Sequence, residues 1–168
     1  MRDCTYIAAD FDHDEGAVDT LKWMKEYGYI DFKNAHDIQQ SNDSSLACSI
    51  KQSLRMRMDN SFKFVLIVGY HTDTVSKGGC QICASYNSHT GCCARGNTVD
   101  YRSFIKFECD KAVEDELTIV VLYYDEKVNR DLCPEVVRQK GTHRQMLCRG
   151  DDGQLQWDLS GIARAFNS

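Results

Sequence analysis

The chain has 168 residues, 42% of them hydrophobic and one of them proline, and its formal net charge at pH 7 is −5. The length favours one domain with a single core, and the apolar content argues against a disordered or linker-rich chain. The acidic balance gives no electrostatic reason to expect nucleic acid or an anionic membrane as a partner, although backbone amides at a helix start can still hold a small anion.

The beginning of the sequence, MRDCTYIAAD, lacks the pattern of an export signal, and no apolar run approaches the ~20 residues that span a bilayer. The nine cysteines are an odd number. We therefore expect mostly reduced thiols, no membrane association and a cytoplasmic location.

Strand and helix patterns alternate along the chain. Apolar runs of strand length occur at residues 5–12, 29–35, 62–69 and 117–124, the second being the weakest. Helical spacing occurs at residues 14–28, 44–58 and 157–166 and in the stretch before 117. Asp14 is in position to cap the first of these helices and Gly28 to end it. The runs at 62–69 and 117–124 are apolar without alternation, as in strands that are covered on both faces.

This order predicts an α/β fold with a flavodoxin-like, open, mostly parallel sheet and helices on both faces. Ligands bind such sheets beyond the carboxyl ends of the strands. The polar segments expected at that edge are 10–14, 36–43 and 69–73.

A single domain over 1–168 is predicted to carry an insertion at about 73–100. This segment separates a strand from its following helix by far more than the usual ~2–6 residues. We expect it to border the ligand crevice and to act as a lid or as a partner-sensing element.

One carboxylate, Glu108, lies in the middle of an apolar arc of the helix that precedes 117. The other members of the arc are Tyr101, Phe104, Ile105, Phe107 and Ala112. A single acid in such a place is often a rim residue, which reaches solvent past the sheet edge or pairs with Lys111 or a nearby histidine. The alternative is a functional carboxylate facing the crevice.

Four segments carry a family resemblance. They are YIAADFDHD, FVLIVGYHT with Gly69 and Thr72, FIKFECDKAVEDELTIVVLY with an aromatic-x-x-x-Glu pattern, and WDLSGIARAF. Together they resemble the TIR-like domains, specifically the bacterial branch that includes the TIR proteins of Thoeris antiphage defence. The resemblance covers nearly the whole chain except 73–100 and about 125–150, and it implies a TIR-like fold.

The resemblance places Glu108 on the family's catalytic glutamate, which lies at the nicotinamide ribose of NAD. It implies substrate-binding residues around the crevice, namely Ala9, Asp10, Phe11, Asp12, His71, Thr72 and Phe104. The implied activity is that of an NAD nucleosidase or ADP-ribosyl cyclase, with NAD as substrate and no cofactor. In that branch a cyclic ADP-ribose product switches on a separate effector protein after phage infection. A homo-oligomer is compatible with this activity.

The chemistry of the bond agrees with a single carboxylate. Cleavage leaves an oxocarbenium-like ribose, whose positive charge a carboxylate in a dry pocket stabilises more strongly than one in water. Because nicotinamide departs as a neutral molecule, no general acid is needed, whereas ordinary glycosidases use two carboxyl groups.

The residues at 10–14 allow other interpretations. Phe11 can stack on a base and Asp12 can bond a ribose, or both belong to a loop that caps the first helix. The acidic cluster also suggests magnesium and phosphoryl-aspartate chemistry, as in receiver domains. Those domains need an Asp ending the third strand and a Lys ending a later one, and VLIVGYH and VVLYYDE lack them.

The insertion holds a cysteine-rich stretch with one C-x2-C. Cys80, Cys83, His89 and Cys92 form a conceivable zinc set, but the spacing is not a paired-knuckle pattern and free thiols are favoured. The function hypotheses from other classes are a TIR-like interaction module without turnover and a nucleotide-binding relative on the same sheet. Fold analogy alone cannot separate these from the enzyme.

Overall fold

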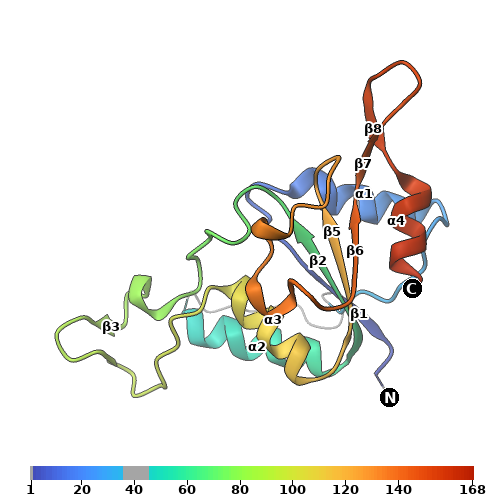
Figure 1. Ribbon diagram of the computed structural model, residues 1–168. Coiled ribbons are helices and arrows are strands. Elements are labelled where there is room, and N and C mark those ends of the chain that lie inside the picture. The colour runs from blue at the N-terminus through green and yellow to red at the C-terminus, as the bar shows by residue number, and fades with distance from the viewer. Residues whose placement is uncertain (1, 36–45) are drawn as a thin grey trace.

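A four-stranded parallel sheet forms the centre of the computed structural model, which describes residues 2–35 and 46–168. Its strands, in spatial order, are β1 (Cys4–Ala8), β2 (Ser61–Val68), β5 (Thr118–Tyr123) and β6 (Thr142–Gln145). All three pairings are parallel (Figure 1). The predicted α/β fold with a parallel sheet is confirmed.

Two helices cover each face of this sheet (Figure 1). The helices are α1 (Glu15–Glu26) and α4 (Leu159–Phe166) on one face, and α2 (Ala47–Asp59) and α3 (Phe104–Glu114) on the other. Alternate residues of each strand enter the two cores, so Tyr6 and Leu66 pack with α2 and α3 whereas Ile7 and Val65 pack with α1 and α4. β2 is buried except at Phe62, as expected for a strand covered on both sides.

The strand predicted at 29–35 is wrong. This segment touches β1 at a single parallel bridge between Asn34 and Thr5, next to a hydrogen bond from the Thr5 N–H to the Lys33 carbonyl at 2.8 Å. Ile30 and Phe32 are buried in the core under α1, so the apolar pattern of this segment reflects side-chain packing and not pairing with another strand. The predicted polar loop at 36–43 and the first two residues of the helix predicted at 44–58 lie outside the described residues.

The sequence between 125 and 157 contains three strands that the pattern did not predict. They are β6 and the hairpin of β7 (Leu147–Arg149) with β8 (Leu155–Trp157), preceded by two single turns of 3-10 helix, Arg130–Leu132 and Glu135–Val137. β6 is a short edge strand of polar, half-buried residues, THRQ, and therefore has no apolar run. The hairpin projects from the body (Figure 1), and at its base Trp157 stacks on Tyr124 with ring centroids 5.5 Å apart.

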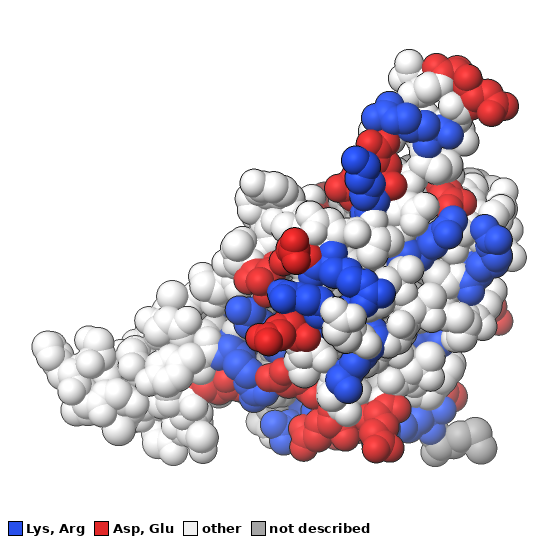
Figure 2. Space-filling model, in the orientation of Figure 1, with Lys and Arg blue, Asp and Glu red and all other residues white. Residues whose placement is uncertain are grey.

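The insertion forms a lobe that extends away from the sheet (Figure 1). It contains a turn of 3-10 helix, Cys80–Ile82, and a small hairpin of β3 (Tyr86–Asn87) and β4 (Cys92–Cys93). Figure 2 shows this lobe without charge on the visible face, whereas acidic and basic side chains intermingle over the body. In the sequence Arg95 is the single Lys, Arg, Asp or Glu between Gly79 and Val99.

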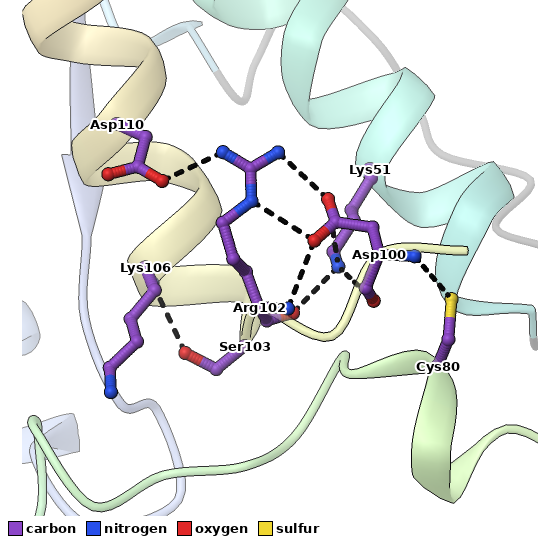
Figure 3. A network of polar contacts seen from close by, with 7 residues as sticks. All are labelled: Lys51, Cys80, Asp100, Arg102, Ser103, Lys106 and Asp110. Carbon is purple, nitrogen blue, oxygen red and sulfur yellow. Dashed lines mark hydrogen bonds and ion pairs between the residues drawn. The ribbon is translucent and has the colours of Figure 1, made fainter. Parts of the chain in front are cut away.

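A polar clamp fixes the end of the insertion to the body (Figure 3). The ammonium of Lys51, on α2, donates to the carbonyls of Asp100 at 3.3 Å and of Arg102 at 2.6 Å. The Arg102 guanidinium in turn bonds the Asp100 carboxylate and, at 2.8 Å, that of Asp110 on α3. The insertion is therefore tied to both helices of one face.

Among the described residues, no helix is long and apolar enough to cross a membrane. All nine cysteines are free thiols in the structure.

Candidate functional site

Glu108 is buried against the first strand rather than placed on the rim. α3 begins at Phe104, where the Ser103 hydroxyl accepts the Lys106 N–H at 3.2 Å, and Glu108 follows one turn later on the sheet-facing side. Its side chain is 6% exposed, and the Tyr6 hydroxyl of β1 donates a hydrogen bond to its Oε1.

The rim interpretation of Glu108 is wrong. Lys111, the partner that interpretation offered, pairs instead with Asp115 at 2.6 Å and with Asp59 at 3.0 Å. A carboxylate is costly to bury in a core unless hydrogen bonds or opposite charges compensate it.

Burial raises the pKa of Glu108 to about 7, while the Tyr6 hydroxyl and the positive charge of Arg57 oppose this rise. Arg57 comes from α2 and is itself buried. A pKa near 7 places the change of charge of this buried carboxyl group close to neutral pH. Such tuning is common at catalytic carboxyl groups.

Glu108 lines a cavity of about 150 Å³ at the carboxyl edge of the sheet. The other lining residues are Ala9, Asp10, Phe11, Asp12, Ile50, Leu54, Val75, Lys77, Phe104 and Ile105. Six of the eight residues named from the sequence thus surround one space, and two residues of the insertion, at 75 and 77, border it. A ligand site for a drug-sized molecule usually measures ~300–1,000 Å³, so this cavity accommodates one ring system of a larger ligand.

The loop after β1 presents Phe11 and Asp12 to the mouth of the cavity. Phe11 is 51% exposed, so it is not a core residue under the first helix. Asp12 pairs with Lys77 of the insertion at 3.0 Å. Asp10 is buried, where it accepts the Asp12 N–H at 3.2 Å and pairs with His13 at 2.6 Å, so it shapes the loop as well as lining the cavity.

His71 and Thr72, the other two residues named from the sequence, lie in the turn after β2 and do not line this cavity. The Thr72 hydroxyl is buried and accepts the Gly69 N–H at 2.8 Å, which closes the turn. The His71 ring packs against that of His13 with centroids 4.5 Å apart. Both residues support the neighbouring loops.

Asp14 occupies the N-cap position of α1, but its side chain makes no capping hydrogen bond, contrary to the prediction. Its carboxylate instead fills the space above Gly69, where any Cβ would overlap it. Burial and the charge of Asp10 raise the pKa of Asp14 to about 6, against the opposing effect of His13 and His71.

Sequence patterns missed Tyr6, Arg57 and Lys77 as members of the site. Tyr6 could have been found, because a tyrosine inside a buried strand needs a partner for its hydroxyl and alternation points it toward α3. Arg57 lies on α2, whose helical prediction rested on the spacing of its apolar residues and gave no reason to single out a charged one. Lys77 could not be identified from the sequence, because the insertion has no helical or strand periodicity from which the direction of its side chain could be predicted.

The conceivable zinc ligands do not converge in the structure. Cys80 is buried and its sulfur accepts the Asp100 N–H at 3.2 Å, whereas Cys92 is exposed in the β3–β4 hairpin. Within residues 2–35 and 46–168 no group of three or more His, Cys, Asp or Glu side chains could hold a metal ion. We derive no step that involves zinc.

Comparison with known proteins adds no assignment: no protein-family model matches the chain, and no curated protein is significantly similar to it.

Proposed function

We propose that this protein is a TIR-like enzyme that cleaves the bond between nicotinamide and ribose in NAD. The observation that carries the proposal is the buried Glu108 carboxyl, set at the carboxyl edge of a parallel sheet and facing a cavity of one-ring size. The sheet order and the four sequence segments support the TIR-like assignment.

In the proposed mechanism the nicotinamide ribose lies in the cavity beside ionised Glu108. As the glycosidic bond breaks, the carboxylate stabilises the positive charge that develops on the ribose, and the dry surroundings strengthen this attraction. Tyr6 holds the carboxylate in place from β1. Nicotinamide leaves as a neutral molecule and takes the electron pair of the broken bond, so no proton donor is required.

The acceptor that follows decides the product. Attack by water on the ribose gives ADP-ribose, and attack by a hydroxyl or ring nitrogen of the same molecule gives a cyclic ADP-ribose. We propose a cytoplasmic role in antiphage defence, in which the product acts on a separate effector protein. This part of the proposal depends on the family resemblance.

Two observations favour the competing proposal of an interaction module without turnover. The cavity holds only part of a dinucleotide, and a lobe without charge on its visible face projects from the body. A module, however, has no use for a buried carboxyl whose ionisation in the folded state is unfavourable. The enzyme therefore accounts for more of the geometry.

The test is incubation of the purified protein with NAD and chromatography of the products. We expect release of nicotinamide together with ADP-ribose or a cyclic isomer. Because an enzyme of this kind can require assembly, the assay runs over a range of protein concentrations. Intact NAD at every concentration would favour the module.

A further inference from the structure

Lys77 holds a distinctive place at the mouth of the Glu108 cavity. Its carbonyl accepts the N–H of Phe104, the first residue of α3, at 2.9 Å. The next residue, Gly78, has a φ of +102° and packs so closely on the Phe104 ring that no Cβ would fit. The backbone of Lys77 is therefore fixed to the helix that carries Glu108, even though it belongs to the insertion.

The charges around the cavity are otherwise acidic. Among the described residues that line it, Lys77 is the one cation, whereas Asp10, Asp12 and Glu108 all carry carboxyl groups. A cation at the point of contact favours the entry of an anionic ligand into an acidic cavity of a protein with a net charge of −5.

The Lys77–Asp12 pair is open to solvent. The two side chains are 66% and 64% exposed, and the Lys77 ammonium lies 3.0 Å from the Asp12 carboxylate. An exposed pair of this kind contributes little to stability, so a stronger anion can displace the carboxylate at small cost. The diphosphate of a dinucleotide is such an anion.

We propose that Lys77 binds the diphosphate of the substrate and that Asp12 is its counter-ion in the free protein. The inference rests on the proposed function, because it places the nicotinamide ribose at Glu108. The cavity then encloses that ribose, and the diphosphate, which is bonded to the 5′ carbon of the same ribose, lies at the mouth beside Lys77. Asp12 is on this basis a competitor of the substrate and not a ribose ligand.

The two roles of Asp12 predict opposite effects, which calorimetry with ADP can separate. Lys77→Met is expected to weaken ADP binding about tenfold, the effect of losing one hydrogen bond between charged groups. Asp12→Asn is expected to tighten ADP binding about two- to fivefold, because it removes an exposed competing ion pair. Binding of adenosine, which has no phosphate, is expected to stay unchanged in both variants.

Lys22 and Asp19 provide the matched control, because they form an exposed pair on α1 at 3.3 Å that does not line the cavity. Lys22→Met and Asp19→Asn should leave ADP binding as in wild type. An ADP affinity unaffected by Lys77→Met, an equal loss for adenosine, a weaker affinity in Asp12→Asn, or no ADP binding by wild type would each overturn the inference.

Nicotinamide release, measured in parallel, separates this inference from the proposed function. ADP binding that depends on Lys77 in a protein that leaves NAD intact would retain the anion site and refute the enzyme. Release of nicotinamide with the same Michaelis constant in wild type and Lys77→Met would retain the enzyme and refute the anion site.

Discussion

At the scale of single residues, burial and two opposing interactions set the charge of the candidate catalytic group. Burial favours the neutral form of Glu108 and raises its pKa to about 7, whereas the Tyr6 hydroxyl and the positive charge of Arg57 favour the ionised form. The carboxylate is the form that stabilises a positively charged ribose. The balance among these effects should therefore set the pH range of activity.

Tyr6→Phe removes the hydroxyl and is expected to raise the pKa of Glu108 further. The acid limb of the pH–rate profile should move to higher pH, with a severalfold loss near neutral pH and a rate within about twofold of wild type once Glu108 is fully ionised. Tyr123→Phe is the control, because Tyr123 is also a buried strand tyrosine but its hydroxyl bonds His143 at 2.8 Å. A profile that loses height in Tyr6→Phe without moving along the pH axis would assign Tyr6 a purely structural role.

The pKa of Glu108 also predicts how stability depends on pH. Between its ordinary pKa of 4.5 and the folded value of about 7, the folded chain keeps a proton that the unfolded chain has released. The contribution of Glu108 to the free energy of unfolding therefore falls as pH rises through this interval and stays constant above it.

Glu108→Gln lacks this titration, so we expect it to be more stable than wild type at about pH 8, by on the order of 3 kcal/mol, and to lose this advantage at about pH 4. Urea unfolding of both proteins at the two pH values measures the difference, and the groups that they share cancel. An advantage of equal size at both pH values would show that Glu108 is ionised without cost.

Phe11 contributes an exposed aromatic face beside the cavity. Phe11→Ala should raise the Michaelis constant for NAD about five- to hundredfold, as expected for the loss of one base stack, and change the free energy of unfolding by less than about 0.5 kcal/mol. Tyr70→Ala is the control, because Tyr70 is 79% exposed on the facing loop and does not line the cavity. A clear loss of stability with an unchanged Michaelis constant would mean that Phe11 packs rather than binds.

At the scale of elements, helices and strands with a long apolar pattern were predicted correctly, whereas short or polar elements were not. Long apolar patterns located α1, α2, α3, α4 and the strands β1, β2 and β5, because burial on one or both faces leaves a period that can be read from the sequence. The edge strand β6 is polar and four residues long, so it leaves none. The segment at 29–35 has an apolar pattern that wrongly indicated a strand, because Ile30 and Phe32 are buried without pairing to a neighbouring strand.

The candidate site shows the same division. Glu108 could be found because it interrupts an apolar arc, and Phe11 because it follows a strand. Lys77 could not, since its place depends on how the insertion returns to α3. The position of Thr72 outside the cavity could not be predicted either, because it depends on the hydrogen bond that the Thr72 hydroxyl accepts from the Gly69 N–H.

The insertion depends on Lys51 for its attachment. Lys51→Met leaves the carbonyls of Asp100 and Arg102 without their ammonium donor, which should cost about 1–3 kcal/mol and loosen residues 80–100. Hydrogen exchange of the amides in that segment should become faster than in Lys22→Met, which removes an exposed lysine of α1. Equal exchange rates of this segment in the two variants would show that the attachment of the lobe does not depend on Lys51.

At the scale of the whole molecule, the parallel sheet explains how distant parts of the sequence form one site. β1 and the helix α3 are about 100 residues apart, yet α3 crosses the face of the sheet and brings Glu108 to Tyr6. Since the four strands of the central sheet point the same way, the loops at their carboxyl ends gather at one edge. The insertion adds the cation that the acidic cavity lacks.

The most direct test of the proposed catalytic role compares nicotinamide release from NAD by wild type, Glu108→Gln and Glu114→Gln. Glu114 lies on the same helix but is exposed, so its variant controls for the loss of one negative charge. We predict release by wild type and Glu114→Gln, and a loss of at least about a hundredfold in a folded Glu108→Gln protein, the size expected when a charge-stabilising group is removed. Near-wild-type release by Glu108→Gln would contradict the catalytic role of this carboxylate.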